Sequence, residues 1–255
     1  ACKLPLVNRD GSKMHAEPRP AFATTEIRHI GEPMAVVVAE TLAQARDAAD
    51  LVEVDIATKP TVTDPRAALE PGAPQVSPAY PNNLCLDYAF GDAAAVAKAF
   101  AEAAHVTTLD LVNNRLAVVA MEPRAAVAEY DAARDHFTLH VGSQGVFNLK
   151  NTLANDILKI DPAKLRVLTY DVGGSFGMKI PSYPEYVACL HAAKRLGRPV
   201  RWRDERSESF LSDHQGRDSL YEARLALDAD GNFTAIEVDV VGNLGAYMSF
   251  VGPMI

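Results

Sequence analysis

Cysteine is scarce in this sequence. Its 255 residues include three cysteines, Cys2, Cys85 and Cys189, an odd number spread far apart. They form neither a C-x-x-C pair nor a disulfide framework, so the sequence predicts a reducing compartment, the cytoplasm. The same scarcity argues against an iron–sulfur cluster within this stretch, because such clusters are held by several cysteine thiolates.

Long apolar runs and excess positive charge are also missing. No apolar run approaches the roughly 20 residues that span a bilayer, and the first 20 residues lack the apolar core of a signal peptide. Lys and Arg number 25 against 33 Asp and Glu, giving a net charge of -8. This balance argues against nucleic acid or an anionic membrane as the main partner. With 48% hydrophobic and 23% charged residues, the sequence has the composition of a globular protein of one large or two ordinary domains.

The apolar pattern predicts an α+β fold in two unequal pieces. Residues 33–40 form a continuous apolar run and residues 51–57 alternate, so both are expected to be strands. Between them, Thr41 and Gln44 have capping-box spacing and open a helix, which completes a β-α-β unit. Turn-forming residues follow, and we place a domain boundary near residue 80.

The second piece mixes further strands and helices. Asp92 is expected to cap a helix over 93–104, and Ser182 with Glu185 is expected to cap a helix that ends at Gly197. A hairpin is expected over 219–242, turned at Asp230–Gly231. The remaining elements are a helix over 146–158 and strands over 106–112, 124–131, 136–142 and 165–172.

A glycine loop follows the last of these strands, in "RVLTYDVGGSFGMKIPSYPEY" (166–186). Strand, glycines and helix start are the parts of an anion cradle. However, Met178 separates Gly177 from Lys179, so the P-loop pattern fails, and Val172 stands where a dinucleotide fingerprint needs glycine. Taken alone, the loop favours a tight turn with Phe176 packed into the core.

A second strand-to-helix junction lies upstream, in "LHVGSQGVFNLK" (139–150). Gln144 stands at its corner, and its amide can both donate and accept hydrogen bonds. Taken alone, Gln144 would be a surface turn residue.

Six short segments, in this order, resemble the large subunit of the molybdenum hydroxylases, the family of xanthine dehydrogenases, aldehyde oxidoreductases and aerobic carbon monoxide dehydrogenases. They are Ser143–Gln144, Gly173–Lys179, Gly197–Val200, Glu205–Glu208, Gly216–Arg217 and Gly245–Tyr247. The resemblance implies that 1–80 is the C-terminal part of the family's small N-terminal α/β domain plus a linker. Residues 81–255 would be most of the first molybdopterin-binding domain, incomplete at its C-terminus.

The resemblance also implies a cofactor, a molybdenum–pyranopterin in its cytosine dinucleotide form. Gln144 would donate a hydrogen bond to an oxo ligand, and Phe176 would lie against the metal, neither of them ligating it. The residues implied to bind the cofactor are Gln144, Gly173, Gly174, Ser175, Phe176 and Gly177. A Cβ at Gly174 or Gly177 would push the backbone off the cofactor.

The implied reaction is hydroxylation of an aldehyde, a heteroaromatic carbon or carbon monoxide with oxygen from water. Electrons would pass to a 2Fe-2S small subunit and an FAD-binding medium subunit, in a dimer of heterotrimers. Ile180 stands where xanthine-oxidising members have a Glu, which argues against purines. No catalytic residue is assigned within this chain, because the family's base is a Glu in a late glycine-rich segment.

Other assignments stay open at this point. Glu122 is interpreted as structural and Glu185 as a helix cap, while Lys179 pairs either with a cofactor phosphate or with an acidic neighbour. The sequence begins without Met and ends in mid-segment, so we expect part of a longer chain, inactive alone. The alternatives are a non-catalytic structural or assembly polypeptide that keeps the fold without the metal, and a module that binds a nucleotide through its phosphates.

Overall fold

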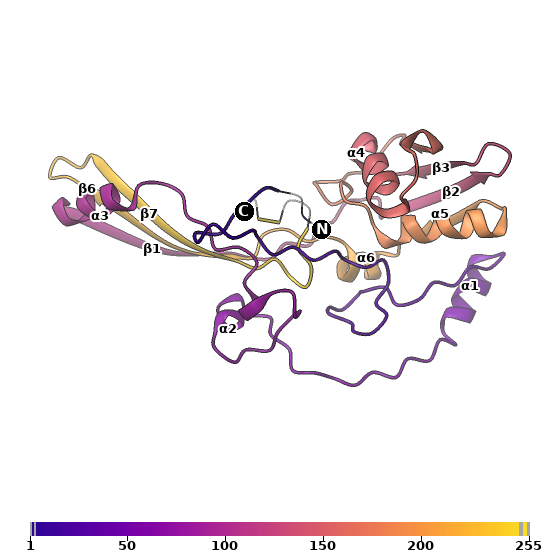
Figure 1. Cartoon of the computed structure of the whole chain (residues 1–255), viewed down its shortest axis with the longest axis horizontal. Helices are drawn as coiled ribbons and strands as arrows, with labels where there is room; N and C mark the ends of the chain where they lie inside the picture. Colours follow the sequence, from indigo (N-terminus) through magenta and orange to yellow (C-terminus); the bar gives the residue numbers. More distant parts are fainter. Residues whose placement is uncertain (1, 3, 250–251, 254–255) are drawn as a thin grey trace. The chain divides into compact units, whose positions relative to one another are not determined.

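Two separate β-sheets organise the chain (Figure 1). The computed structural model describes residues 2, 4–249 and 252–253. It divides into a four-stranded unit, Pro20–Thr58 with Ala117–Gln215, and a three-stranded unit, Ala1–Arg19 with Lys59–Leu116 and Gly216–Ile255. Both contain helices and sheet, so the predicted α+β class is confirmed.

The sheet of the four-stranded unit has the order β4-β3-β2-β5. β2 pairs with β3 and β5 antiparallel, and β3 pairs with β4 parallel through a helical crossover. The elements are α1 (Leu42–Ala49), β2 (Ala125–Asp131), β3 (His136–Val141), α4 (Val146–Asn151), the π-helical η2 (Thr152–Leu158), η3 (Pro162–Lys164), β4 (Leu165–Leu168), α5 (Pro184–Leu196), β5 (Val200–Arg203) and α6 (Arg206–Ser212). The predicted strands and helices of residues 124–197 occur in the expected order. The helix expected over 146–158 is π-helical from Thr152, and β4 is shorter than the expected 165–172. The sequence did not predict β5 and α6.

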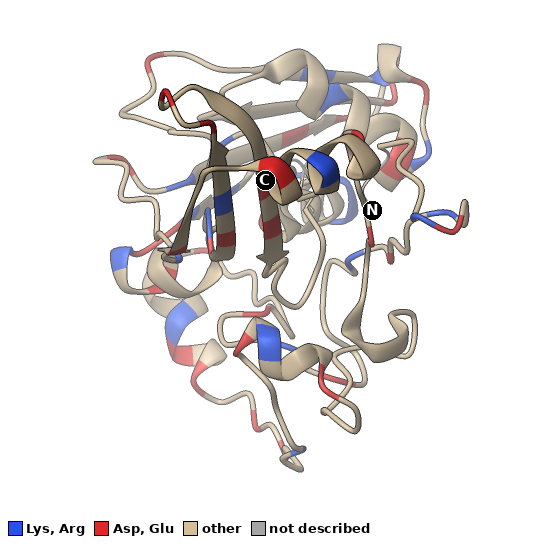
Figure 2. Cartoon of the chain, turned by 90° about the vertical axis from the view of Figure 1, so that its left-hand side faces the viewer, with Lys and Arg blue, Asp and Glu red and all other residues tan. Residues whose placement is uncertain are grey.

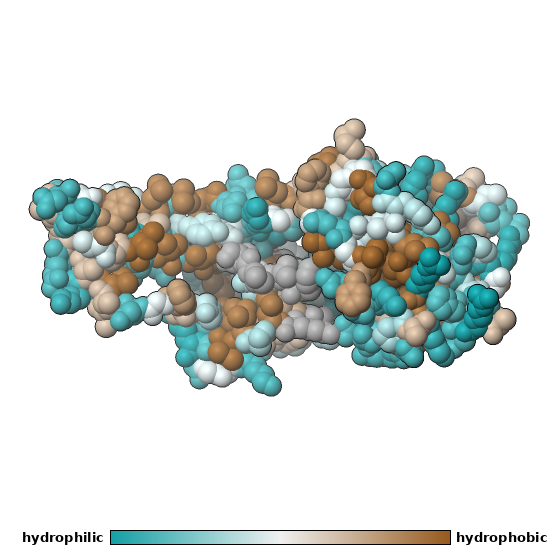
Figure 3. Space-filling view, turned by 90° about the horizontal axis from the view of Figure 1, so that it is seen from above, coloured by the Kyte–Doolittle hydropathy of each residue, from teal (hydrophilic) through white to brown (hydrophobic). Residues whose placement is uncertain are grey.

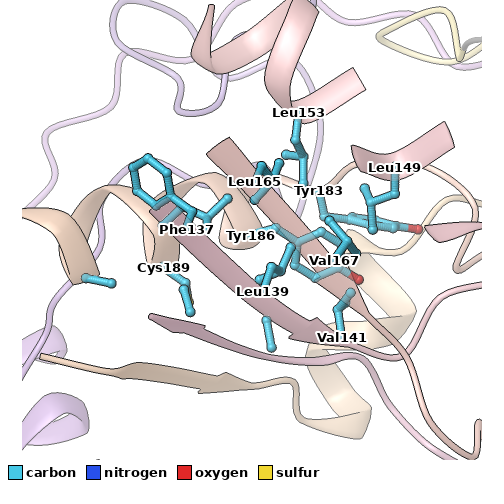
Figure 4. Close-up of a cluster of buried hydrophobic side chains, with 14 of the residues drawn as sticks. Phe137, Leu139, Val141, Leu149, Leu153, Leu165, Val167, Tyr183, Tyr186 and Cys189 are labelled. Carbon is cyan, nitrogen blue, oxygen red and sulfur yellow. The ribbon is translucent and has the colours of Figure 1, made fainter. Parts of the chain in front are cut away.

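The core of this unit lies between the sheet and its helices. Strict alternation in β3 turns Phe137, Leu139 and Val141 inward, and each is at most 5% exposed. They pack with Leu149 of α4 and with the buried face of α5 (Figure 4). This packing fixes the ends of β3 and β4, from which the two glycine junctions emerge.

Helix α5 ends as predicted but begins differently. Gly197 closes it in the left-handed conformation, with φ of +64°. Its N-cap is Tyr183 with Pro184 at the first position, and no side chain caps the helix. The capping box expected of Ser182 and Glu185 was therefore wrong, because the Glu185 carboxylate binds a buried arginine instead.

The β-α-β unit predicted for the N-terminal piece is also wrong in part. Thr41 and Gln44 form the expected capping box of α1, but residues 33–40 and 51–57 form no strand. Val36 and Ile56 are 54% and 56% exposed. An apolar pattern indicates which residues suit a strand, yet a strand forms only where a neighbouring strand accepts its hydrogen bonds.

The three-stranded unit contains a long antiparallel sheet in the order β1-β6-β7. The hairpin predicted over 219–242 is confirmed, and Asp228 accepts hydrogen bonds from the backbone of its turn. The elements are α2 (Pro65–Leu69), η1 (Pro81–Asn83), α3 (Ala93–Glu102), β1 (His105–Asn113), β6 (Ser219–Leu227) and β7 (Phe233–Gly242). Asp92 caps α3 as predicted.

The two faces of this sheet differ in character. On one face, Arg224 lies 4.5 Å from the Phe100 ring of α3, and Glu222 pairs with Arg66 of α2. The other face is apolar and open, with side chains 43–62% exposed. It carries Leu109, Leu111, Ile236, Val238 and Val240. Hydrophobic side chains accordingly reach the surface in this part of the chain, on the left of Figure 3.

Charged residues of both signs are interspersed along the chain (Figure 2). None of the helices in the described part of the chain has the length and apolar composition to cross a bilayer.

Candidate functional site

Two neighbouring strand ends bring Gln144 and the glycine loop together. β3 and β4 are parallel, so their carboxyl ends lie at the same edge of the sheet. The junction with Gln144 follows β3, and the loop Gly173–Lys179 follows β4. The Gly177 N–H donates to Gln144 Oε1 at 2.9 Å, and the Gln144 N–H donates to the Lys179 carbonyl at 3.2 Å. Two segments predicted from separate patterns thus lie in contact with each other.

The contact with Gly177 fixes which end of the Gln144 amide faces outward. Because Oε1 accepts the Gly177 N–H, the two donors on Nε2 are left for another group. The Gln144 side chain is exposed. The Gln144 side chain can therefore donate hydrogen bonds through Nε2 to a group bound beside the loop.

The loop satisfies most of its own polar groups. Met178 N–H donates to the Ser175 carbonyl at 3.0 Å, and Lys179 N–H donates to Ser175 Oγ at 3.1 Å. The backbone N–H groups of Ser175 and Phe176 have no hydrogen-bond partner among the described residues. Adjacent free donors at a turn form a concavity that attracts an anionic or oxo-type acceptor.

Phe176 is the strained residue of the loop. Its φ of +51° is unfavourable for a side chain of this size, and the side chain is 79% exposed. The alternative of a plain turn with Phe176 packed into the core is therefore wrong. Strain of this kind persists only where surrounding contacts enforce it, and it is concentrated at functional sites.

The glycines are required for different reasons. A Cβ at Gly173 would lie 2.6 Å from the Cβ of Glu122, and one at Gly174 would lie 3.1 Å from the Phe176 ring. At Gly177 φ is +90°, and no atom lies within 4 Å of the added Cβ. Protein neighbours therefore require the first two, while the space beside Gly177 is open. The prediction that a Cβ at Gly174 or Gly177 would press on a cofactor stays a prediction.

Lys179 is buried and pairs with Glu122. Its Nζ lies 2.6 Å from Glu122 Oε2, which also accepts the Gly173 N–H at 3.0 Å. The hydrogen bond from Lys179 lowers the pKa of Glu122. Of the two alternatives for Lys179, the structure has the acidic neighbour, and it supports the interpretation of Glu122 as structural.

Sequence reasoning missed the buried Arg124. Its side chain is 0% exposed and donates to both oxygens of Glu185, at 3.0 and 3.2 Å, and to Asp213. Asp204 Oδ2 lies 3.5 Å away, and burial raises the pKa of Asp204 to about 6. In the sequence, Arg124 is a single charged residue just before the apolar residues of β2. The alternating pattern of a strand does not show whether such an arginine is buried or on the surface.

Two family models match most of this chain. Residues 76–255 match the molybdopterin cofactor-binding domain, and residues 2–60 match the a/b hammerhead domain of aldehyde oxidase and xanthine dehydrogenase. The chain belongs to the molybdenum hydroxylase large-subunit family. The resemblance drawn from the six sequence segments is thereby confirmed.

Individual relatives of the family support the same membership. The 6-hydroxypseudooxynicotine dehydrogenase complex subunit gamma of Paenarthrobacter nicotinovorans is 34% identical over 92% of this chain and 29% of its own length. The nicotine 6-hydroxylase large subunit of the same bacterium is 32% identical, over 89% and 28%. The solved structure of quinoline 2-oxidoreductase from Pseudomonas putida 86 is similar to this chain with a TM-score of 0.81 and 32% sequence identity. The match covers 89% of this chain and 29% of that one. The chain thus spans about three tenths of these relatives' length.

Among the described residues, no group of three or more His, Cys, Asp or Glu side chains is placed to hold a metal ion.

Proposed function

We propose that this chain forms part of the molybdenum-cofactor site of an oxidoreductase that hydroxylates a carbon centre with oxygen from water. One observation carries the proposal. The Gly177 N–H holds Gln144 Oε1, so that Nε2 faces outward beside a loop with two further unpaired N–H donors. Hydrogen-bond donors on two adjoining segments, beside an exposed aromatic ring and an open glycine, suit an oxo- and phosphate-bearing group.

The residues present fit that group. Gln144 Nε2 would donate to an oxygen of the metal centre, and the N–H groups of Ser175 and Phe176 would hold a second oxygen. The ring of Phe176 would line the site, while Gly177 would leave the space that the group occupies. Gly173 and Gly174 let the loop pack on its own supporting residues. When bound, the molybdenum–pyranopterin would supply the oxidation of the carbon centre.

This chain's contribution is orientation and hydrogen bonding rather than proton transfer. The hydrogen bond from Lys179 lowers the pKa of Glu122, which makes its carboxylate a weaker base. We propose that the base lies in a part of the protein outside these 255 residues. The 255 residues alone are then expected to be inactive.

The substrate class follows from relatives named for nicotine 6-hydroxylase and quinoline 2-oxidoreductase. We propose an electron-poor heteroaromatic carbon first, with an aldehyde or carbon monoxide as alternatives. Ile180, in place of an acidic residue, disfavours purines. Electrons would pass to 2Fe-2S and FAD-binding partner subunits in a cytoplasmic dimer of heterotrimers, and the cofactor would carry cytosine dinucleotide. The domain boundary near residue 80 also stays a prediction.

The test is metal and cofactor analysis of the complete polypeptide that contains this sequence. It is purified with its copurifying chains from a molybdate-supplied host that makes the cofactor. We expect about one molybdenum per chain, cytidine monophosphate after acid hydrolysis, and iron and FAD in the complex. A folded complex without molybdenum would contradict the proposal and favour the non-catalytic polypeptide. Phosphate-dependent nucleotide binding without molybdenum would favour the nucleotide-binding module.

A further inference from the structure

Two connections run from the buried ion cluster around Arg124 to the glycine loop. The first is along the chain. Glu122 lies two residues before Arg124 and binds both Lys179 and the Gly173 N–H. The Arg124 carbonyl in turn accepts the Asp204 N–H at 2.9 Å, which fixes this short segment in place.

The second connection passes through Tyr183. Its ring lies face-on to the guanidinium, with Arg124 Cζ 3.7 Å from the ring centre, and the residue is 1% exposed. Its hydroxyl donates to the Met178 carbonyl at 2.8 Å and accepts the His214 N–H at 3.1 Å. Arg124 thus packs on the same ring whose hydroxyl binds the Met178 carbonyl.

The Met178 carbonyl, to which Tyr183 donates, lies next to the hydrogen bond between Gly177 and Gln144. The Met178 carbonyl and the Lys179 N–H belong to one peptide plane, and Ser175 Oγ accepts that N–H at 3.1 Å. Hydrogen bonds at both edges fix the orientation of this plane. The residue immediately before it, Gly177, donates the N–H that orients Gln144.

We propose that Arg124 and Tyr183 are positioning residues, which hold the loop so that Gly177 presents its N–H to Gln144. The catalytic consequence rests on the proposed function, whereas the ordering of the loop does not.

An arginine suits this place better than a lysine. Its planar fork binds both oxygens of Glu185 while its flat face lies against the Tyr183 ring. An ammonium is a compact point charge that has neither a planar fork nor a flat face to stack. Asp204 and Asp213 complete a ring of three carboxylates around one guanidinium. Removing the charge would leave these buried carboxylates without a cation, so a neutral substitution at Arg124 endangers folding.

The test therefore uses Tyr183→Phe, which keeps the ring and removes the hydroxyl. Tyr186→Phe is the matched control, because Tyr186 is equally buried, lies three residues along the same segment, and its hydroxyl forms no hydrogen bond with the loop among the described residues. Backbone hydrogen–deuterium exchange is measured on the complete protein, in peptides that cover 172–181. We expect exchange in Tyr183→Phe to rise about five- to tenfold, the loss of one buried hydrogen bond, and the control to match the parent.

Equal exchange in the two variants and the parent would overturn the proposal, as would an equal rise in both variants. Arg124→Lys gives a second measurement. Trp202, the sole tryptophan, has its ring centre 4.9 Å from Arg124 Cζ, so its fluorescence is expected to change together with faster loop exchange. A changed fluorescence with unchanged loop exchange would overturn the role of Arg124.

Turnover separates this inference from the proposed function. In the complete complex, Tyr183→Phe is expected to lower kcat with molybdenum content retained and KM little changed. If the parent complex holds no molybdenum, the proposed function fails, and the exchange experiment still decides whether the two residues order the loop.

Discussion

Strands in both sheets of this chain alternate apolar and polar residues, but the apolar side chains are buried in one sheet and exposed in the other. In the four-stranded unit, alternation turns Phe137, Leu139 and Val141 into a core in which each is at most 5% exposed. In the three-stranded unit, alternation is just as regular, yet Leu109 and Ile236 remain 54% and 62% exposed on one face. Alternation thus determines which residues share a face, whereas the elements packed on that face determine whether it becomes a core.

The candidate site belongs to the unit with the closed core. Gln144 and the glycine loop emerge from two strands whose ends are fixed by that packing. A site needs supporting residues whose own positions are fixed, because small displacements of a donor weaken its hydrogen bonds. The comparison of the two units predicts four effects, which decrease in their cost to folding stability.

The largest effect is expected from Leu139→Ala, compared with Leu109→Ala. Both change one strand leucine, but Leu139 is 0% exposed and Leu109 is 54% exposed. We expect a loss of about 3–4 kcal/mol for Leu139 and less than about 1 kcal/mol for Leu109. Chemical denaturation of the chain measures both, and equal losses would mean that the open face is a core in solution.

The second effect uses a glycine of positive φ in each unit. Gly177→Val in the loop and Gly231→Val in the β6–β7 turn start from φ of +90° and +83°, and neither added Cβ meets an atom within 4 Å. Both are expected to cost about 1–3 kcal/mol through backbone strain. Only Gly177→Val is expected to abolish cofactor loading of the complete enzyme. Normal molybdenum content in that variant would place the cofactor elsewhere.

The third effect compares the loss of a carboxylate charge beside the loop with the same loss on the surface. Glu122→Gln weakens the pair with buried Lys179, whereas Glu102→Gln affects only the exposed pair with Lys98. We expect a loss of about 1 kcal/mol at pH 7 for Glu122, which is 44% exposed, and less than about 0.5 kcal/mol for Glu102.

This third effect should depend on pH. The folded chain lowers the pKa of Glu122 below its ordinary 4.5, chiefly through the Lys179 hydrogen bond. A lowered pKa stabilises the fold above the ordinary value, and that stabilisation is lost as pH falls through the folded value. The gap between parent and Glu122→Gln should therefore narrow below about pH 4.5. A gap that widens on acidification would contradict the pairing.

The smallest cost to stability is expected at Gln144. Gln144→Ala removes an exposed side chain, and Gln75→Ala is the matched control in a loop of the other unit. Both should change the free energy of unfolding by less than about 0.5 kcal/mol. In the complete enzyme, Gln144→Ala is expected to slow turnover about tenfold with most molybdenum retained. An unchanged rate would mean that the amide does not interact with the cofactor.

The sequence predicted local elements well because their signals are local. The caps at Thr41 and Asp92, the stop at Gly197 and the hairpin turn at Asp230–Gly231 all depend on a few consecutive residues. The strands expected over 33–40 and 51–57 did not form. Strand formation depends on a neighbouring strand that pairs with it, and a local pattern does not show whether one is present.

The candidate site was predicted in part for the same reason. Gln144 and the glycine loop were recognised from ordered motifs, and the structure brings them into contact. The Glu185 carboxylate was assigned to a helix cap from its spacing, but it pairs with Arg124, 61 residues away. Spacing along the sequence does not encode such a distant partner, and neither does it show that Tyr183 supports the loop.

The 2.6 Å separation that an added Cβ at Gly173 would have from the Cβ of Glu122 has a practical consequence for protein engineering. The seven residues from Gly173 to Lys179 are not a portable module. Grafted into another scaffold, they would lose Glu122 and Gln144, which come from outside the loop and hold it. A transplant must therefore move three distant chain segments as one block.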